Sequence, residues 1–83
     1  MLENILLPGM ETEKGIDILI SLTRMNSDNM RHALMRHYVN GWSDATACSC
    51  SGVSLSNFSR DSKKLNEVAR LIDTYHELNY KRG

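Results

Sequence analysis

The stretch that most constrains this fold is Gly52–Arg60, which reads Gly-Val-Ser-Leu-Ser-Asn-Phe-Ser-Arg. Gly52 can adopt the positive φ angle that a tight turn between two helices requires. Ser54 is suited to cap a following helix, because its hydroxyl can accept a hydrogen bond from a free backbone N–H group. Phe58 then falls about one turn into that helix and is expected to point back toward the turn. With Ser43–Cys50 as the preceding helix, the stretch predicts a helix-turn-helix.

A helical wheel at about 100° per residue divides the second helix of this pair into two faces. Phe58 and Leu65 lie on one face, which we expect to be buried. The opposite face and its flanks carry cations and small hydrogen-bonding side chains, namely Ser56, Asn57, Ser59, Arg60, Lys63 and Lys64. Such side chains suit phosphates and base edges, so this face has the chemistry of a DNA-reading surface. A solvated helix after an ordinary turn is the alternative interpretation of the same residues.

Two serines extend this candidate site. Ser43 and Ser54 are expected to begin the two helices of the pair, and a helix N-terminus favours phosphate. We therefore predict DNA contacts at Ser43, Ser54, Ser56, Asn57, Arg60, Lys63 and Lys64.

The rest of the chain predicts further helices and an apolar N-terminal arm. Apolar residues recur at helical spacing over residues 11–24 and 28–39, and Pro8-Gly9 and Asn40-Gly41 interrupt the pattern. From Ser54 a helix can run to about Leu78, either continuously or with a bend near Asn66. Tyr80 to Gly83 are expected to be a frayed tail. The arm residues expected to pack on the core or on a neighbouring subunit are Leu2, Ile5, Leu6 and Leu7.

These patterns predict one all-α domain of four to five helices over residues 1–83. Since a core of 83 residues is marginal alone, oligomerisation would help to stabilise it. The helix at residues 11–24 has two apolar stripes, so it should be packed against other segments on two of its sides. Either one stripe meets a second protomer, or the helix is buried all round. The candidate oligomerisation residues are Ile16, Ile18, Leu19 and Leu22.

The charge balance limits how tightly one copy can bind DNA. Ten basic and ten acidic residues give a net charge of zero. Residues 1–23 hold four acidic residues and one lysine, whereas residues 54–83 hold six basic and four acidic residues. The positive end therefore coincides with the proposed reading helix. Several copies side by side would be needed for useful affinity.

Other classes of function have little support. Cys48 and Cys50 fall on opposite faces of a helix, so we expect a core residue and an exposed thiol rather than a ligand pair. A metal or redox sensor would have to use Cys48, Cys50, His32, His37 and His76, whose spacing is poor for zinc. No phosphate loop, nucleophile elbow or zinc-protease motif is present, so we expect no enzyme activity.

The sequence also bears on location. Its longest apolar run, Ile18–Leu22, is too short to cross a membrane, and no signal peptide is apparent after Met1. We expect a cytoplasmic protein without a membrane, metal, cofactor or small-molecule partner.

Beyond the turn, residues 6–76 contain a set of residues whose order and spacing are together fairly specific. The set comprises Leu6–Gly9, Asn26–Asp28, Tyr38–Gly41 with Ser43, Cys48, Val53–Ser54, Phe58, Arg60, Leu65–Asn66, Ala69–Leu71 and Tyr75. In order and spacing the chain resembles the PapB-type family of pilus (fimbrial) operon regulators.

The resemblance implies a small bacterial regulator that binds A/T-rich double-stranded DNA near adhesin promoters. It also implies a homo-oligomer on repeated sites, activation or repression of pilus genes, and minor-groove contacts. Family members often carry a basic residue after the serine that begins the third helix, whereas this chain has Asp44, which would repel a phosphate. A recognition helix normally enters the major groove, but narrow A/T-rich minor grooves attract Arg and Lys. The sequence leaves both routes open.

A second function fits the same fold. A helix-turn-helix domain can modulate another regulator through protein–protein contacts without binding DNA, and the zero net charge favours this alternative. Its contact residues would be Trp42, Met25, Met30 and Met35.

Overall fold

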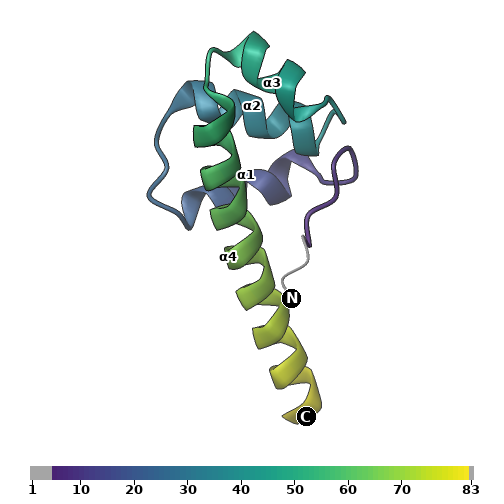
Figure 1. Ribbon diagram of the computed structural model, residues 1–83. Helices are drawn as coiled ribbons and strands as arrows, with labels where there is room; N and C mark the ends of the chain where they lie inside the picture. The colour runs from purple at the N-terminus through teal and green to yellow at the C-terminus, as the bar shows by residue number, and fades with distance from the viewer. Residues whose placement is uncertain (1–4, 83) are drawn as a thin grey trace.

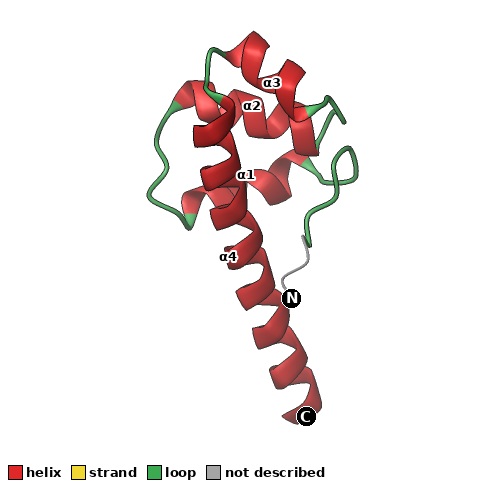
Figure 2. Cartoon of the chain, viewed as in Figure 1, coloured by secondary structure: helices red, strands yellow, loops and turns green. Residues whose placement is uncertain are grey.

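The computed structural model describes residues 5–82, with side chains up to Asn79. This part of the chain contains four helices joined by loops. They are α1 (Glu13–Ser21), α2 (Asp28–Tyr38), α3 (Asp44–Ser51) and α4 (Leu55–Arg82). Figure 1 shows α1, α2 and α3 packed around the first half of α4, while the second half extends beyond them. Figure 2 shows helices and loops but no strand over the same residues, so the predicted all-α class is confirmed.

Each helix begins at a hydroxyl side chain that accepts a hydrogen bond from the backbone N–H three residues later. These caps are Thr12, Ser27, Ser43 and Ser54. Such a cap satisfies one of the N–H groups that the first turn leaves without a partner, and it typically contributes about 1 kcal/mol. The caps fix where each helix starts, and those at Ser43 and Ser54 are the ones that the sequence predicts.

The first helix is shorter than the predicted range of residues 11–24. The Ser21 hydroxyl donates to the carbonyl of Ile18 at 2.6 Å, and the Thr23 hydroxyl donates to the carbonyl of Ile20 at 2.7 Å. Hydroxyl side chains compete in this way with the backbone for carbonyl acceptors, and they disfavour a continuing helix. Consequently α1 ends at Ser21, three residues before the expected end.

The core lies where α1, α2 and the first half of α4 meet. Ile16, Leu34 and Leu65, one from each of these helices, are fully buried. The other buried members of the cluster are Leu6, Leu19, Ile20, Met30, Ala33, Met35, Tyr38, Cys48 and Phe58.

A bidentate ion pair also joins α1 to α2, with Arg31 Nε at 2.9 Å from Asp17 Oδ1 and Arg31 Nη2 at 3.0 Å from Asp17 Oδ2.

The last helix is continuous. It runs from Leu55 to Arg82 without interruption, so α4 follows the continuous alternative and not the one with a bend near Asn66, and the predicted frayed tail is wrong for Tyr80 to Arg82. Gly83 lies outside the described residues. None of the helices in the described chain is both long enough and apolar enough to cross a membrane.

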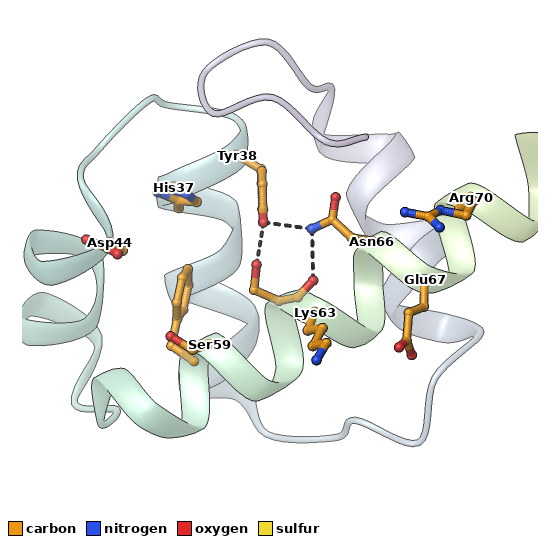
Figure 3. A pocket seen from close by; sticks show the side chains of 10 residues that line it. His37, Tyr38, Asp44, Ser59, Lys63, Asn66, Glu67 and Arg70 are labelled. Atoms are coloured by element: carbon orange, nitrogen blue, oxygen red, sulfur yellow. Dashed lines mark hydrogen bonds between the residues drawn. The ribbon is translucent and has the colours of Figure 1, made fainter. Parts of the chain in front are cut away.

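Asn66 is a buried polar residue that joins three segments. Its Oδ1 accepts a hydrogen bond from the backbone N–H of Leu6 at 2.9 Å. Its Nδ2 donates to Tyr38 Oη at 3.2 Å and to the carbonyl of Ser62 at 3.0 Å. The hydroxyls of Tyr38 and Ser62 are hydrogen-bonded to each other, and Figure 3 shows the bonds that join Tyr38, Asn66 and Ser62. The side chain at which one of the two alternatives places a bend therefore holds α4 against α2 and the N-terminal arm.

The N-terminal arm packs across the end of α2. Leu6 is buried in the core, whereas Ile5 and Leu7 are exposed and Leu2 lies outside the described residues. The backbone N–H groups of Gly9 and Glu11 donate to the carbonyls of His37 and Tyr38, at 3.2 and 3.1 Å. These carbonyls at the end of α2 have no partner within the helix, so the arm satisfies them.

Two glycines permit this contact. Gly9 has a φ of 76° and Gly41 a φ of 81°. A Cβ atom added to Gly9 would lie 3.1 Å from Gly41 Cα, so the two backbones approach more closely than ordinary side chains allow. Glycine adopts such positive φ angles without strain, and both glycines lie where the sequence predicts an interruption of the helical pattern.

We predict that Asn66→Ala lowers the free energy of unfolding by about 2–4 kcal/mol, because it leaves the Leu6 N–H buried without its acceptor and opens a small cavity. Urea unfolding followed by circular dichroism measures the change. Asn26→Ala, in the exposed loop before α2, is the control and should change stability by less than about 0.5 kcal/mol. If the two substitutions lowered the free energy of unfolding equally, the buried network would contribute no more to stability than an exposed loop residue does.

Candidate nucleic-acid interface

A three-residue turn joins α3 to α4. Gly52 follows Ser51 with φ 73° and ψ 31°, the left-handed conformation predicted for it, and its N–H donates to the carbonyl of Cys48. A Cβ added to Gly52 would meet Asn29 Nδ2 at 3.8 Å, an ordinary contact, so it is the backbone conformation and not space that favours glycine here. Ser54 then caps α4 by accepting from the N–H of Asn57 at 3.2 Å.

The core fixes which face of α4 points outward. Phe58 is 3% exposed and Leu65 is fully buried. The Phe58 ring meets the His37 ring edge-on, with centroids 5.4 Å apart. Val53, in the turn, is half-buried against the same cluster. These contacts set the rotation of α4 about its axis, as the helical wheel predicts.

All five predicted contact residues of α4 lie on the exposed side: Ser56, Asn57, Arg60, Lys63 and Lys64. Arg60, Lys63 and Lys64 are neighbours on one helix surface, because residues three and four apart are adjacent on a helix. Ser56 and Asn57 lie one turn nearer the start of the helix. The structure thus brings these five residues together as one outward surface, which we call the α4 face.

The two predicted serine contacts are engaged in capping. The Ser43 hydroxyl accepts from the backbone N–H of Thr46 and donates to Thr46 Oγ1 at 2.9 Å. The Ser54 hydroxyl accepts from Asn57. What these positions offer to an anion is therefore the exposed N-terminus of a helix rather than a free hydroxyl.

A groove of about 380 Å³ borders the α4 face. It lies between the end of α2, the start of α3 and one side of α4, and Figure 3 shows His37, Asp44 and Lys63 on its walls. Its charged lining residues are Asp44, Lys63, Glu67 and Arg70. Arg70 is not among the residues that the sequence predicts for the site. Its position seven residues after Lys63 is the signal that places both on one side of the helix.

Acidic side chains weaken the positive potential of this surface. Arg60 Nε lies 3.3 Å from Asp61 Oδ1, and the Arg60 side chain is 63% exposed. Asp44 opens α3, where the helix dipole favours an anion. Asp44 and Lys63 line the same groove, so the Asp44 carboxylate lies in the groove that borders the α4 face.

The two cysteines have different environments, as predicted. Cys48 is buried and Cys50 is exposed. Burial raises the pKa of the Cys48 thiol, and the negative charge of Asp44 raises this pKa further. Among the described residues, no three His, Cys, Asp or Glu side chains are grouped so that they could hold a metal ion.

Two of the four candidate oligomerisation residues are placed differently from the prediction. Ile16 is fully buried and Leu19 is 8% exposed, because both pack into the core of their own chain. They are therefore not available to a second protomer. Ile18 and Leu22 are 55% and 58% exposed and form the only part of the predicted set at the surface.

Fewer of the residues predicted to make contacts in the alternative, protein–protein function lie at the surface. Met30 and Met35 are buried, and Met25 packs partly buried against the core, so these methionines do not form a free contact surface. Trp42 is 39% exposed, and the Arg36 guanidinium lies 5.4 Å from the centre of its ring. Arg36 also donates to Ser51 Oγ at 2.6 Å, which ties α2 to α3.

No family model, curated protein or solved structure matches this chain. The resemblance to pilus regulators therefore rests on the residues named for it above, and the function has to be argued from the geometry of the site.

The cysteine environments generate a direct prediction. One thiol per native chain should react rapidly with Ellman's reagent, because Cys50 is exposed while Cys48 is buried and has a raised pKa. Denaturant should make both react. Cys50→Ser should remove the rapid phase, and a rapid phase that persists in this variant would mean that Cys48 is accessible.

Proposed function

We propose that this protein is a DNA-binding transcription regulator of the pilus or adhesin type, and that the α4 face contacts the duplex. The observation that carries the proposal is the exposure of Arg60, Lys63 and Lys64 on a helix whose rotation is fixed by Phe58 and Leu65. A rigid helix with a polar, cationic outer surface has the size and the chemistry to enter a DNA groove.

Each part of the surface supports a different contact. Arg60 and Asn57 are the residue types that bind guanine and adenine edges in pairs of hydrogen bonds. The two lysines suit phosphates on either side of the groove, and the N-terminus of α3 adds a further phosphate site. In the alternative geometry, Arg60 inserts into a narrow A/T-rich minor groove. Both geometries use the same face.

The few cations imply weak binding by one copy. Three phosphate contacts correspond to a slope of about −2.7 in a plot of log affinity against log salt. Several copies on adjacent sites convert weak single contacts into useful affinity. We therefore propose a homo-oligomer on repeated A/T-rich sites, acting in the cytoplasm where the chromosome is accessible. The preference for A/T-rich adhesin promoters comes from the resemblance alone.

Arg60→Ala should weaken binding to an A/T-rich duplex by about 1–3 kcal/mol if Arg60 reads a base, and Lys63→Ala should flatten the salt slope by about one unit. Fluorescence anisotropy with A/T-rich and random duplexes at several salt concentrations measures both. Lys14→Ala with Arg24→Ala is the matched control, because it removes two exposed cations outside the α4 face. Undiminished affinity of Arg60→Ala with Lys63→Ala, or an equal loss in the control, would refute the assignment.

Asp44→Asn should tighten DNA binding by about threefold to tenfold, because it removes from the groove that Lys63 also lines a negative charge that opposes phosphate. It should also lower the free energy of unfolding by about 0.3–1 kcal/mol, since the first-turn charge favours α3. Glu13→Gln is the control, because Glu13 occupies the same first-turn position in α1. If both variants bind DNA like the parent chain, the start of α3 does not face the duplex.

A protein–protein module is the second candidate. The zero net charge and the half-exposed Trp42 beside Arg36 favour it. Failure to bind either duplex at low salt would support this function over DNA binding.

A further inference from the structure

The second half of α4 projects from the domain with apolar side chains on its surface. Figure 1 shows this segment, residues 70–82, extending beyond the other helices to the C-terminus. Four large apolar residues in it are exposed: Leu71 by 69%, Ile72 by 37%, Tyr75 by 65% and Leu78 by 59%. We call these four residues the apolar stripe.

The apolar stripe continues the buried face of the same helix. Ile72 and Tyr75 lie seven residues after Leu65 and Val68, and residues seven apart share a helix face. Leu65 is fully buried by the domain core, and Val68 is packed against it. One face of α4 is therefore covered by its own chain as far as Val68 and left uncovered beyond it. A stripe of this kind is characteristic of a helix that packs against another helix.

We propose that the apolar stripe binds the same stripe of a second copy of this chain, with the two α4 helices antiparallel. Rows of apolar residues at seven-residue spacing are self-complementary across a two-fold axis. The net charge of zero means that two copies have no overall repulsion to overcome. The stripe also exceeds the surface that Ile18 and Leu22 offer on α1.

The domain itself selects the antiparallel orientation. The rest of the chain occupies the stripe-bearing face of α4 up to Val68, so a parallel partner helix would run into it. An antiparallel partner runs the other way, past the free end of α4.

The size of the contact makes this a weak dimer. Thirteen helical residues span about 20 Å. One such helix contact buries less than the roughly 800 Å² per partner of a standard interface, so we expect dissociation in the micromolar range. Adjacent binding on DNA would strengthen the association.

The arrangement has a consequence that rests on the proposed DNA-binding function, whereas the pairing itself does not. Leu55 and Tyr75 are about 30 Å apart along α4, so an antiparallel pair places the two helix starts about 60 Å apart. The two α4 faces would then reach DNA sites separated by nearly two helical turns of about 34 Å each.

Sedimentation velocity without DNA tests the pairing, and its failure is therefore distinguishable from failure of DNA binding. The parent chain should dimerise reversibly, and Leu71→Gln with Tyr75→Gln should raise the dissociation constant at least about tenfold. Circular dichroism should show an unchanged fold, because both residues are exposed. Thr74→Gln is the control, since Thr74 lies about 90° from the centre of the stripe, and it should change the constant less than about twofold.

A second variant tests the rival surface on α1. If Ile18→Gln with Leu22→Gln abolishes the dimer while the stripe variant retains it, the proposal is overturned. A parent chain that stays monomeric up to millimolar concentration overturns it as well.

Orientation is tested with a spin label on the native thiol of Cys50, which is exposed at the end of α3, five residues before α4 begins. An antiparallel dimer should give a label separation of about 60 Å by pulsed electron resonance, and a parallel dimer roughly half of that or less. A short separation in the dimer would overturn the antiparallel arrangement.

Discussion

The structure depends on one buried amide. Asn66 accepts from the backbone of Leu6 and donates to Tyr38 and to the carbonyl of Ser62, so a single side chain fixes the arm, α2 and α4 relative to one another. A buried polar group is costly unless its hydrogen bonds are made, and the three segments can satisfy this one only in one arrangement. Apolar contacts supply the stability of the core. The Asn66 network ties α4 to α2 and to the arm, and it acts together with the packing of Phe58 and Leu65 that sets which residues α4 presents outward.

Much of this arrangement was predictable from local chemistry. Ser43 and Ser54 cap their helices as expected, and Gly52 makes the predicted turn, because capping and positive φ depend on the residue and its immediate neighbours. The outward position of Arg60, Lys63 and Lys64 followed from helical periodicity. The early end of α1 was missed because two hydroxyls compete for its carbonyls.

Other features depend on contacts between distant segments, which periodicity does not reveal. An asparagine within a helix favours a bend locally, but Asn66 accepts from the backbone N–H of Leu6 and donates to the hydroxyl of Tyr38, both distant in sequence. Similarly, the apolar stripes of α1 were visible, yet which stripe faced the core was not. Ile16 and Leu19 proved to be core, and the larger uncovered apolar surface lies on α4. The groove beside the α4 face likewise unites Asp44 with residues of α4 that are distant in sequence.

The uninterrupted course of α4 also couples its two ends in rotation. Each residue added to a helix turns everything beyond it by about 100°, so the azimuth of Arg60 relative to Tyr75 is set by the number of residues between them. An insertion of one residue after Ala69 would leave both ends chemically intact but swing the projecting end about a quarter turn around the axis. An insertion of seven would restore the original azimuth to within about 20° and only lengthen the rod. A change in the length of this helix thus alters the angle between the two surfaces about the helix axis without any change of their side chains.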